Sequence, residues 1–189
     1  MPPAYTDRMK ASLRILPCLL ALSLVLAACG NDEPDPPQYE TFTSEEGRFR
    51  ADFPGVPTRE ARTEAAGEIN LNLVHYSVDN GDEAVSVSFI DYPEAIAAQD
   101  PRALLDGIAE GAANAANGST QGTESELKSK TPTTFDGHQA IDFEVEIQNR
   151  MLNARAVLVG PRMYLMQVVS EPDIDSESYQ RLTSSFTLI

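Results

Sequence analysis

The sequence predicts an α+β domain in which an antiparallel β-sheet is covered by helices on both faces. Apolar residues alternate strictly with acidic residues over positions 141–147, which is the period of a strand with one buried face. The segment 163–169 is apolar on both faces apart from Gln167, so both of its faces need cover. Two segments with apolar residues at helical spacing, about 100–117 and 176–184, are available to provide that cover.

The first half of the sheet begins with a strand at 49–53 that ends at Pro54-Gly55. Apolar residues then alternate over 69–73 and continue in the opposite phase over 74–78. A slip of one residue turns the apolar set to the other face, so we expect a β-bulge near Leu73-Val74. Asn80-Gly81 predicts a hairpin turn, because both central positions of a type I′ turn need a positive φ.

The return strand of that hairpin runs through Val85, Val87 and Phe89. After the first helix, residues 118–122 read as a loop and 124–130 as another strand. A turn at Asn149-Arg150 then predicts a register with Phe143 opposite Ala156, Val145 opposite Ala154, Ile147 opposite Leu152 and Glu144 opposite Arg155. A further turn at Gly160-Pro161 predicts Val157 opposite Tyr164 and Leu158 opposite Met163.

Each predicted helix has a recognisable start or face. Asp100 can cap the first helix, and Pro101 suits its first position. Small and apolar residues follow at helical spacing, and Asn117-Gly118 predicts its end. The second helix places Tyr179 and Leu182 on one face, and residues 186–189 predict a last short strand.

The N-terminal 28 residues have the layout of an export signal: a basic region, an apolar run too short to span a bilayer, and small residues at its end. Leu26-Ala27-Ala28-Cys29 resembles the lipobox of bacterial lipoproteins. The resemblance implies cleavage between Ala28 and Cys29 and lipid attachment to the Cys29 thiol. An uncleaved anchor helix, or an ordinary signal peptide cut at the same place, are the alternatives.

Residues 29–39 follow as a stalk rich in proline and acidic residues, and residues 40–189 form one domain. The whole chain has a formal net charge of −15, and loss of the signal would make it more negative, since the signal holds three basic residues and one acidic residue. Such a surface repels nucleic acid, so we expect no nucleic-acid partner. The expected location is the bacterial cell envelope, with attachment to the membrane through lipid on Cys29.

Motifs for catalysis are absent from the sequence. The two histidines, His75 and His138, have no cysteine partner and no short metal-ligand spacing. No Gly-x-Ser-x-Gly elbow, phosphate loop or dinucleotide fingerprint is present. We therefore expect neither an enzyme nor a cofactor.

The acidic residues Asp142, Glu144 and Glu146 form the one cluster that could bind a ligand. Period 2 places all three on one face of one strand, about 7 Å apart from one to the next. A divalent cation needs several oxygens at once, which a row this extended supplies poorly. A solvated strand face, with Glu144 beside Arg155, is the alternative that the spacing favours over a metal site.

Several phrases of the domain are similar to those of PsbP-like bacterial lipoproteins: the segment 47–57, which ends in Phe53-Pro54-Gly55-Val56-Pro57, the segment 89–93, and the closing segment 182–188. The resemblance implies an antiparallel sheet with helices on both sides and a binding or assembly module rather than an activity. Two hypotheses follow: a non-enzymatic domain that binds an envelope protein, or a domain that binds a small ligand or divalent cation. An exposed apolar patch would favour the first, and a deep pocket with converging polar groups the second.

Overall fold

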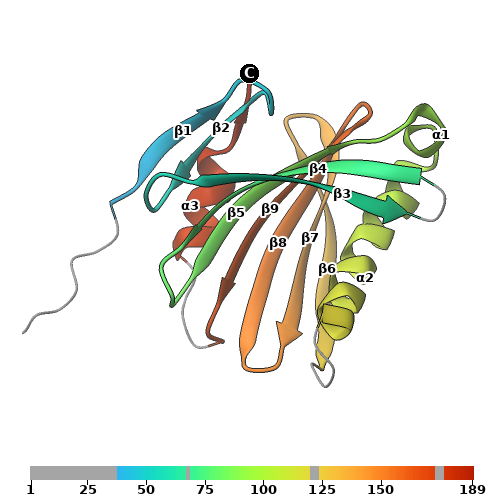
Figure 1. Ribbon diagram of the computed structural model, residues 1–189. Helices are drawn as coiled ribbons and strands as arrows, with labels where there is room; N and C mark the ends of the chain where they lie inside the picture. Colours follow the sequence, from blue (N-terminus) through green and yellow to red (C-terminus); the bar gives the residue numbers. More distant parts are fainter. Residues whose placement is uncertain (1–37, 67–68, 120–123, 173–176) are drawn as a thin grey trace, which may run out of the picture. The chain divides into compact units, whose positions relative to one another are not determined.

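The computed structural model describes residues 38–66, 69–119, 124–172 and 177–189 (Figure 1). The predicted signal peptide, the cleavage position at Ala28, Cys29 and most of the stalk lie outside these residues. Within them, none of the helices combines the length and the apolar character needed to cross a membrane.

A seven-stranded antiparallel sheet forms the centre of the described domain, in the order β3-β4-β5-β9-β8-β7-β6. Its strands are β3 (Thr58–Ala66), β4 (Ile69–Asp79), β5 (Ala84–Asp91), β6 (Ser125–Phe135), β7 (His138–Ile147), β8 (Arg150–Val159) and β9 (Arg162–Ser170). Hairpins join β3 to β4 and β5, and β6 through to β9. The pairing of β5 with β9 then unites the two halves.

A three-stranded sheet of β1 (Glu40–Ser44), β2 (Phe49–Phe53) and β10 (Thr187–Leu188) packs beside the larger one, and β2 lies between the other two strands. This confirms the predicted strand at 49–53 and the short strand at the end of the sequence. The helices are α1 (Glu94–Ala97), α2 (Pro101–Ser119) and α3 (Glu177–Ser185).

The larger sheet has a core on each face. On one face, called here the α3 side, the three-stranded sheet and Leu182 of α3 cover Val85, Val87, Met166 and other residues. On the opposite face, the α2 side, Leu105 and Ala109 of α2 pack on Phe143, Val145 and their neighbours. The antiparallel sheet is confirmed, whereas the helical cover predicted for both faces is present only in part. Helix α2 packs along β6, β7 and β8, and α3 shares its side with β1, β2 and β10.

The predicted register of β7 and β8 is wrong by two residues. Ile147 pairs with Arg150, so the turn consists of Gln148 and Asn149, and Phe143 lies opposite Ala154. Gln148 takes the left-handed conformation at φ 56°. Moving a two-residue turn back by one position shifts the pairing by two and keeps every side chain on its face. The burial of Phe143 was therefore predicted correctly although its partner was not. The pairing of β8 with β9 agrees with the prediction, including Val157 opposite Tyr164.

The bulge expected near Leu73-Val74 is not present, because β4 pairs without interruption with both neighbours. Its apolar residues change phase because the second half of the strand, with Val74, Tyr76 and Val78, turns them to the α3-side core. The Asn80-Gly81 hairpin is confirmed, as a four-residue loop in which Gly81 has φ 94°. A register shift does occur in β6, around Lys128.

Helix α2 begins as predicted. Both carboxylate oxygens of Asp100 accept hydrogen bonds, from the N–H groups of Arg102 and Ala103, each at 3.3 Å. The helix runs to Ser119, beyond the stop expected at Asn117-Gly118. Lys130 of β6 connects to it through Asp106 (3.2 Å) and Glu110 (3.0 Å), which fastens α2 to the edge of the sheet.

Candidate functional site

The acidic row on β7 faces the α3 side, and each of its carboxylates has a partner within the domain. Asp142 accepts two hydrogen bonds from Arg155, at 2.6 and 2.8 Å. The Ser129 hydroxyl donates to Glu144 at 3.0 Å. Lys128 lies 2.7 Å from Glu146. The row is thus a set of surface carboxylates in which Asp142 and Glu146 are paired with basic side chains and Glu144 accepts a hydrogen bond.

The change of register decides which carboxylate meets Arg155. The sequence predicted Glu144, but β8 places Arg155 opposite Asp142 and Asn153 opposite Glu144. The hydrogen bonds from Arg155 to Asp142 raise the pKa of the guanidinium. Tyr179 of α3 lies over the same strands, and its burial, together with the charge of Asp142, raises the pKa of its phenol. Tyr179 and residues of β6, β7 and β8 line a cavity of about 320 Å³.

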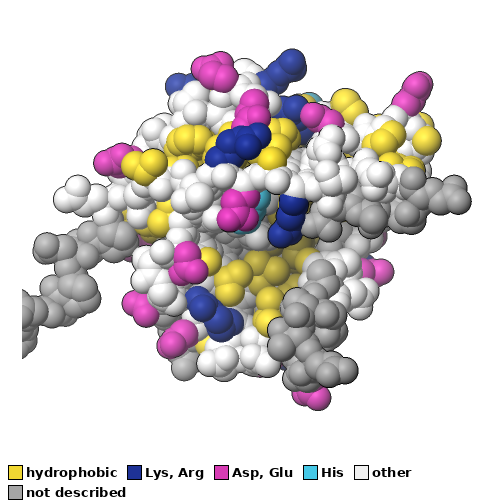
Figure 2. Space-filling model, viewed as in Figure 1, with side chains coloured by type: hydrophobic (Ala, Val, Ile, Leu, Met, Phe, Trp, Pro, Cys, Tyr) yellow, Lys and Arg dark blue, Asp and Glu magenta, His cyan; other side chains and the backbone are white. Residues whose placement is uncertain are grey.

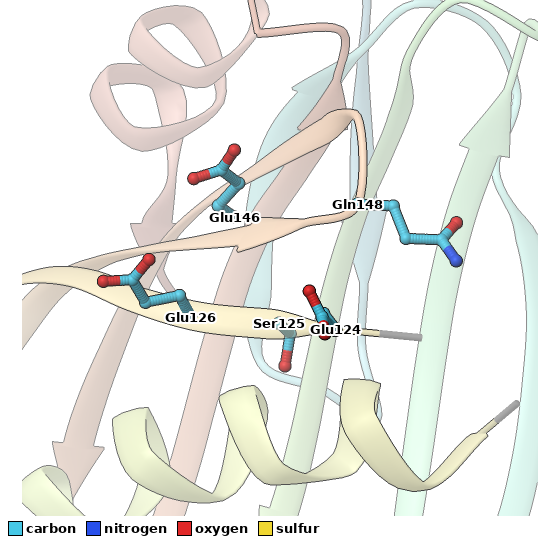
Figure 3. A pocket seen from close by; sticks show the side chains of 5 residues that line it. All are labelled: Glu124, Ser125, Glu126, Glu146 and Gln148. Carbon is cyan, nitrogen blue, oxygen red and sulfur yellow. The ribbon is translucent and has the colours of Figure 1, made fainter. Parts of the chain in front are cut away.

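A second acidic cavity, of about 420 Å³, opens where β6 begins and β7 ends (Figure 3). Glu124, Glu126 and Glu146 contribute carboxylates to it, and the side chains of Glu126 and Glu146 extend from neighbouring strands (Figure 3). Lys128 lies 3.0 Å from Glu126 and 2.7 Å from Glu146. These contacts raise the pKa of its ammonium, which occupies the position between the two carboxylates that a bound cation would need.

The described residues contain no group of three or more His, Cys, Asp or Glu side chains arranged to hold a metal ion. The acidic row alone therefore does not provide the converging oxygens that a divalent cation needs. The sequence predicted a strand at 124–130 but not its pairing with β7, so it did not identify Lys128 as the charge that pairs with both glutamates.

His75 is the histidine with the most constrained surroundings. Its Nδ1 lies 2.8 Å from the Ser88 hydroxyl, and Glu60 lies opposite it on β3. Burial, with the positive charge of Arg62, lowers the pKa of the imidazole. Ser88, His75 and Glu60 have the residue types of a Ser-His-acid catalytic triad, but they do not form a working one. Ser88 is 3% exposed in the middle of a strand, where a substrate carbonyl cannot reach its hydroxyl.

The strongest charge network joins the two sheets. Glu46, after β1, accepts hydrogen bonds from Arg59 (2.5 and 3.1 Å) and from the Tyr76 hydroxyl (2.5 Å). These bonds lower the pKa of Glu46 to about 2. Arg162 donates to the Glu46 carbonyl at 2.9 Å and pairs with Asp91. Every charged group here is engaged within the domain, so the network fixes the smaller sheet on the larger one.

The α2 side of β9 is the surface with an incomplete cover. Leu165, Gln167 and Val169 share this face, and the two apolar residues pack against the α2-side core but remain partly exposed. Helix α2 packs along β6, β7 and β8, so β9 lies beyond it. Figure 2 shows hydrophobic side chains gathered on the floor of a hollow beside α2 and below β3 and β4. The sequence predicted that both faces of this strand need cover, and the described chain supplies full cover on one.

The last residue of the predicted stalk contacts the domain directly. The Tyr39 hydroxyl lies 2.6 Å from Ser178 Oγ, and the Arg181 guanidinium lies 4.4 Å from the centre of the Tyr39 ring. Ser178 also donates a hydrogen bond to Glu83. The chain is therefore fastened to α3 before β1 begins.

This chain is similar in structure to a known protein, whereas the sequence comparisons found no match. No protein family model matches the sequence, and no curated protein sequence matches it significantly. The solution structure of cyanobacterial PsbP (CyanoP) from Synechocystis sp. PCC 6803 is similar, with a TM-score of 0.61 and 15% identity over 87% of this chain and 99% of that one. A Pseudomonas aeruginosa protein of unknown function, PA94, described as a putative regulator, aligns at a TM-score of 0.34 and 15% identity over 71% of this chain and 84% of that one. The first comparison shows a PsbP-like fold, as the resemblance implied.

Proposed function

We propose that this chain is a lipid-anchored protein of the bacterial cell envelope whose PsbP-like domain binds another envelope protein and catalyses no reaction. The lipobox-like sequence at 26–29 supports the anchor, and the PsbP-like fold supports an accessory role. The chemistry of the domain agrees with this role, because the charged clusters described above are satisfied by one another.

The incomplete cover of β9 is the observation that carries the proposal. A strand that is apolar on both faces belongs inside a protein, and Leu165 and Val169 stay only partly buried on one face of β9, which leaves apolar surface for a partner to cover. Leu165 and Val169, with Gln167 between them, would contact the partner. The half-buried amide of Gln167 offers a donor and an acceptor for orientation within an otherwise apolar contact.

Site-specific photo-crosslinking in intact cells tests this function. A photoreactive side chain at Leu165 or Val169 should give one discrete adduct with an envelope protein. The matched control is the exposed Gln180 on α3, which lies on the other side of the sheet and should give no such adduct. Absence of an adduct at both β9 positions, or equal labelling from Gln180, would contradict the proposal.

Binding of a divalent cation is the second candidate, and the geometry favours it less. The Lys128 ammonium already pairs with Glu126 and Glu146, and Arg155 pairs with Asp142. A cation that binds only the native state, present at a concentration of 100 times its dissociation constant, would raise the free energy of unfolding by about 2.7 kcal/mol. We therefore expect millimolar calcium to give no more than a general salt effect on the melting temperature.

A further inference from the structure

Strand β3 forms one edge of the seven-stranded sheet and has an open outer side. It pairs with β4 over all nine of its residues, Thr58–Ala66, and no other described element packs along it. An edge strand of this length presents a row of unpaired N–H and C=O groups, which is a template for another strand. Figure 1 shows β3 in front of the larger sheet, with β4 beside it.

The two edges of the sheet differ in how they are protected. At the other edge, β6 contains Pro132 and the register shift near Lys128, and α2 packs against it. Prolines, bulges and charged side chains are the usual devices that hinder a further strand from pairing, and of these β3 has only the charges, at Arg59, Glu60, Arg62 and Glu64. Strand β3 contains no proline, keeps an unbroken register with β4, and exposes its side chains from Thr58 to Thr63.

We propose that β3 pairs antiparallel with β3 of a second copy of this chain, about a two-fold axis at Ala61. In an antiparallel pair, two residues that lie directly opposite each other point to the same face of the sheet. The axis of a two-fold symmetric pair must therefore pass beside a residue that lies opposite its own copy, and it cannot fall between two residues. A centre at Glu60 sets glutamate opposite glutamate, and a centre at Arg62 sets arginine opposite arginine. A centre at Ala61 sets each Glu60 opposite the other copy's Arg62, and a centre at Thr63 sets each Arg62 opposite the other copy's Glu64, so charge complementarity favours these two registers. The exposed Val56 selects Ala61 between them.

A second observation supports the same register. Val56 is 80% exposed, and it is one of the two exposed large hydrophobic side chains among the described residues. It lies two residues before β3 begins, between Pro54 and Pro57. With the axis at Ala61, Val56 falls opposite position 66 of the second copy, so pairing would bring the end of the other strand beside it. The dimer would thus join the seven-stranded sheets of the two copies into one continuous sheet and reduce the exposure of Val56.

Disulfide trapping in the full-length chain tests this inference, which does not depend on the proposed function. Ala61→Cys places a thiol beside its own symmetry mate and should give a dimer on a non-reducing gel. Thr58→Cys is the matched control, since its two copies would lie six residue positions apart, about 20 Å, and should stay monomeric. The unsubstituted chain controls for Cys18 and Cys29.

A charge exchange tests the register. In the Ala61→Cys background, Glu60→Arg or Arg62→Glu alone should reduce trapping at least several-fold, because like charges then lie opposite each other. The double variant Glu60→Arg/Arg62→Glu restores complementarity and should restore trapping. Three results would overturn the inference: no dimer from Ala61→Cys, equal trapping from Thr58→Cys, or single charge variants that trap as well as the parent.

Discussion

At the scale of single residues, burial separates two neighbours on β7. Phe143 is 1% exposed beneath α2, whereas Glu144 points to the other face and is exposed. Phe143→Ala should lower the free energy of unfolding by about 3–5 kcal/mol, because it removes a buried ring and leaves a cavity. Glu144→Ala should cost less than about 1 kcal/mol, as for other exposed charged contacts. Urea denaturation of both variants checks the ranking, and the reverse order would show that the faces of β7 are misassigned.

His75 predicts how stability depends on pH. Burial and Arg62 lower the pKa of the folded-state imidazole below its ordinary 6.5. The unfolded chain therefore binds more protons in the window just below pH 6.5, and the free energy of unfolding falls as the pH falls through that window. His75→Gln removes the titrating group, so the slope over this window should flatten. Denaturant titrations above and below pH 6.5 measure it, and an unchanged slope in the variant would contradict the assignment.

At the scale of elements, two glycines should respond oppositely to alanine. Gly137 has φ 79° in the two-residue turn between β6 and β7, after Asp136 at φ 48°. Gly137→Ala should cost about 1–2 kcal/mol, because a side chain disfavours the left-handed region. Gly107 lies in α2, where an added methyl group would have open space around it. Gly107→Ala should stabilise by roughly 1 kcal/mol through helix propensity. Thermal melts of the two variants should move in opposite directions, and shifts of the same sign would contradict the turn or the helix.

The elements also show what the sequence can predict. Strict alternation identified β5 and β7 and assigned the correct face to Phe143, because period 2 fixes which residues share a face. Alternation does not fix the pairing between strands, and a turn one position earlier moved Arg155 from Glu144 to Asp142. The extension of β6 to Phe135 was missed although Asp136-Gly137 is a type I′ signal. Strand β3 gives no apolar pattern to find, because its residues from Thr58 to Thr63 are all exposed.

The candidate site was predictable to a similar degree. Polar residues do not alternate with apolar ones over 163–169, which indicated that both faces of β9 need cover. This pattern did not indicate which side the described residues would cover only in part, since that depends on how far α2 reaches across the sheet. The acidic row was located correctly, but its partners were not. Lys128 comes into reach of Glu146 through the pairing of β6 with β7, which the alternation within one strand does not predict.

At the scale of the whole molecule, a domain with a PsbP-like fold follows an N-terminal segment that has the layout of a lipoprotein signal. If Cys29 carries lipid, it becomes the first residue of the processed chain and the attachment point to the membrane. A single acyl chain would bind reversibly, since each buried methylene contributes about 0.8 kcal/mol, and stable attachment needs a second chain or signal. Binding through the open face of β9 would then take place in the envelope, close to the membrane.

Lipid attachment at Cys29 can be tested by metabolic labelling with a fatty acid in cells that express the full chain or its Cys29→Ala variant. We expect the unsubstituted protein to incorporate label and to sediment with membranes. We also expect Cys29→Ala to take up none, because the thiol is the acceptor. A Ser23→Ala variant, altered within the apolar run, serves as the control and should still be labelled. Label retained on the Cys29→Ala protein, or absent from the unsubstituted one, would contradict lipid attachment at Cys29.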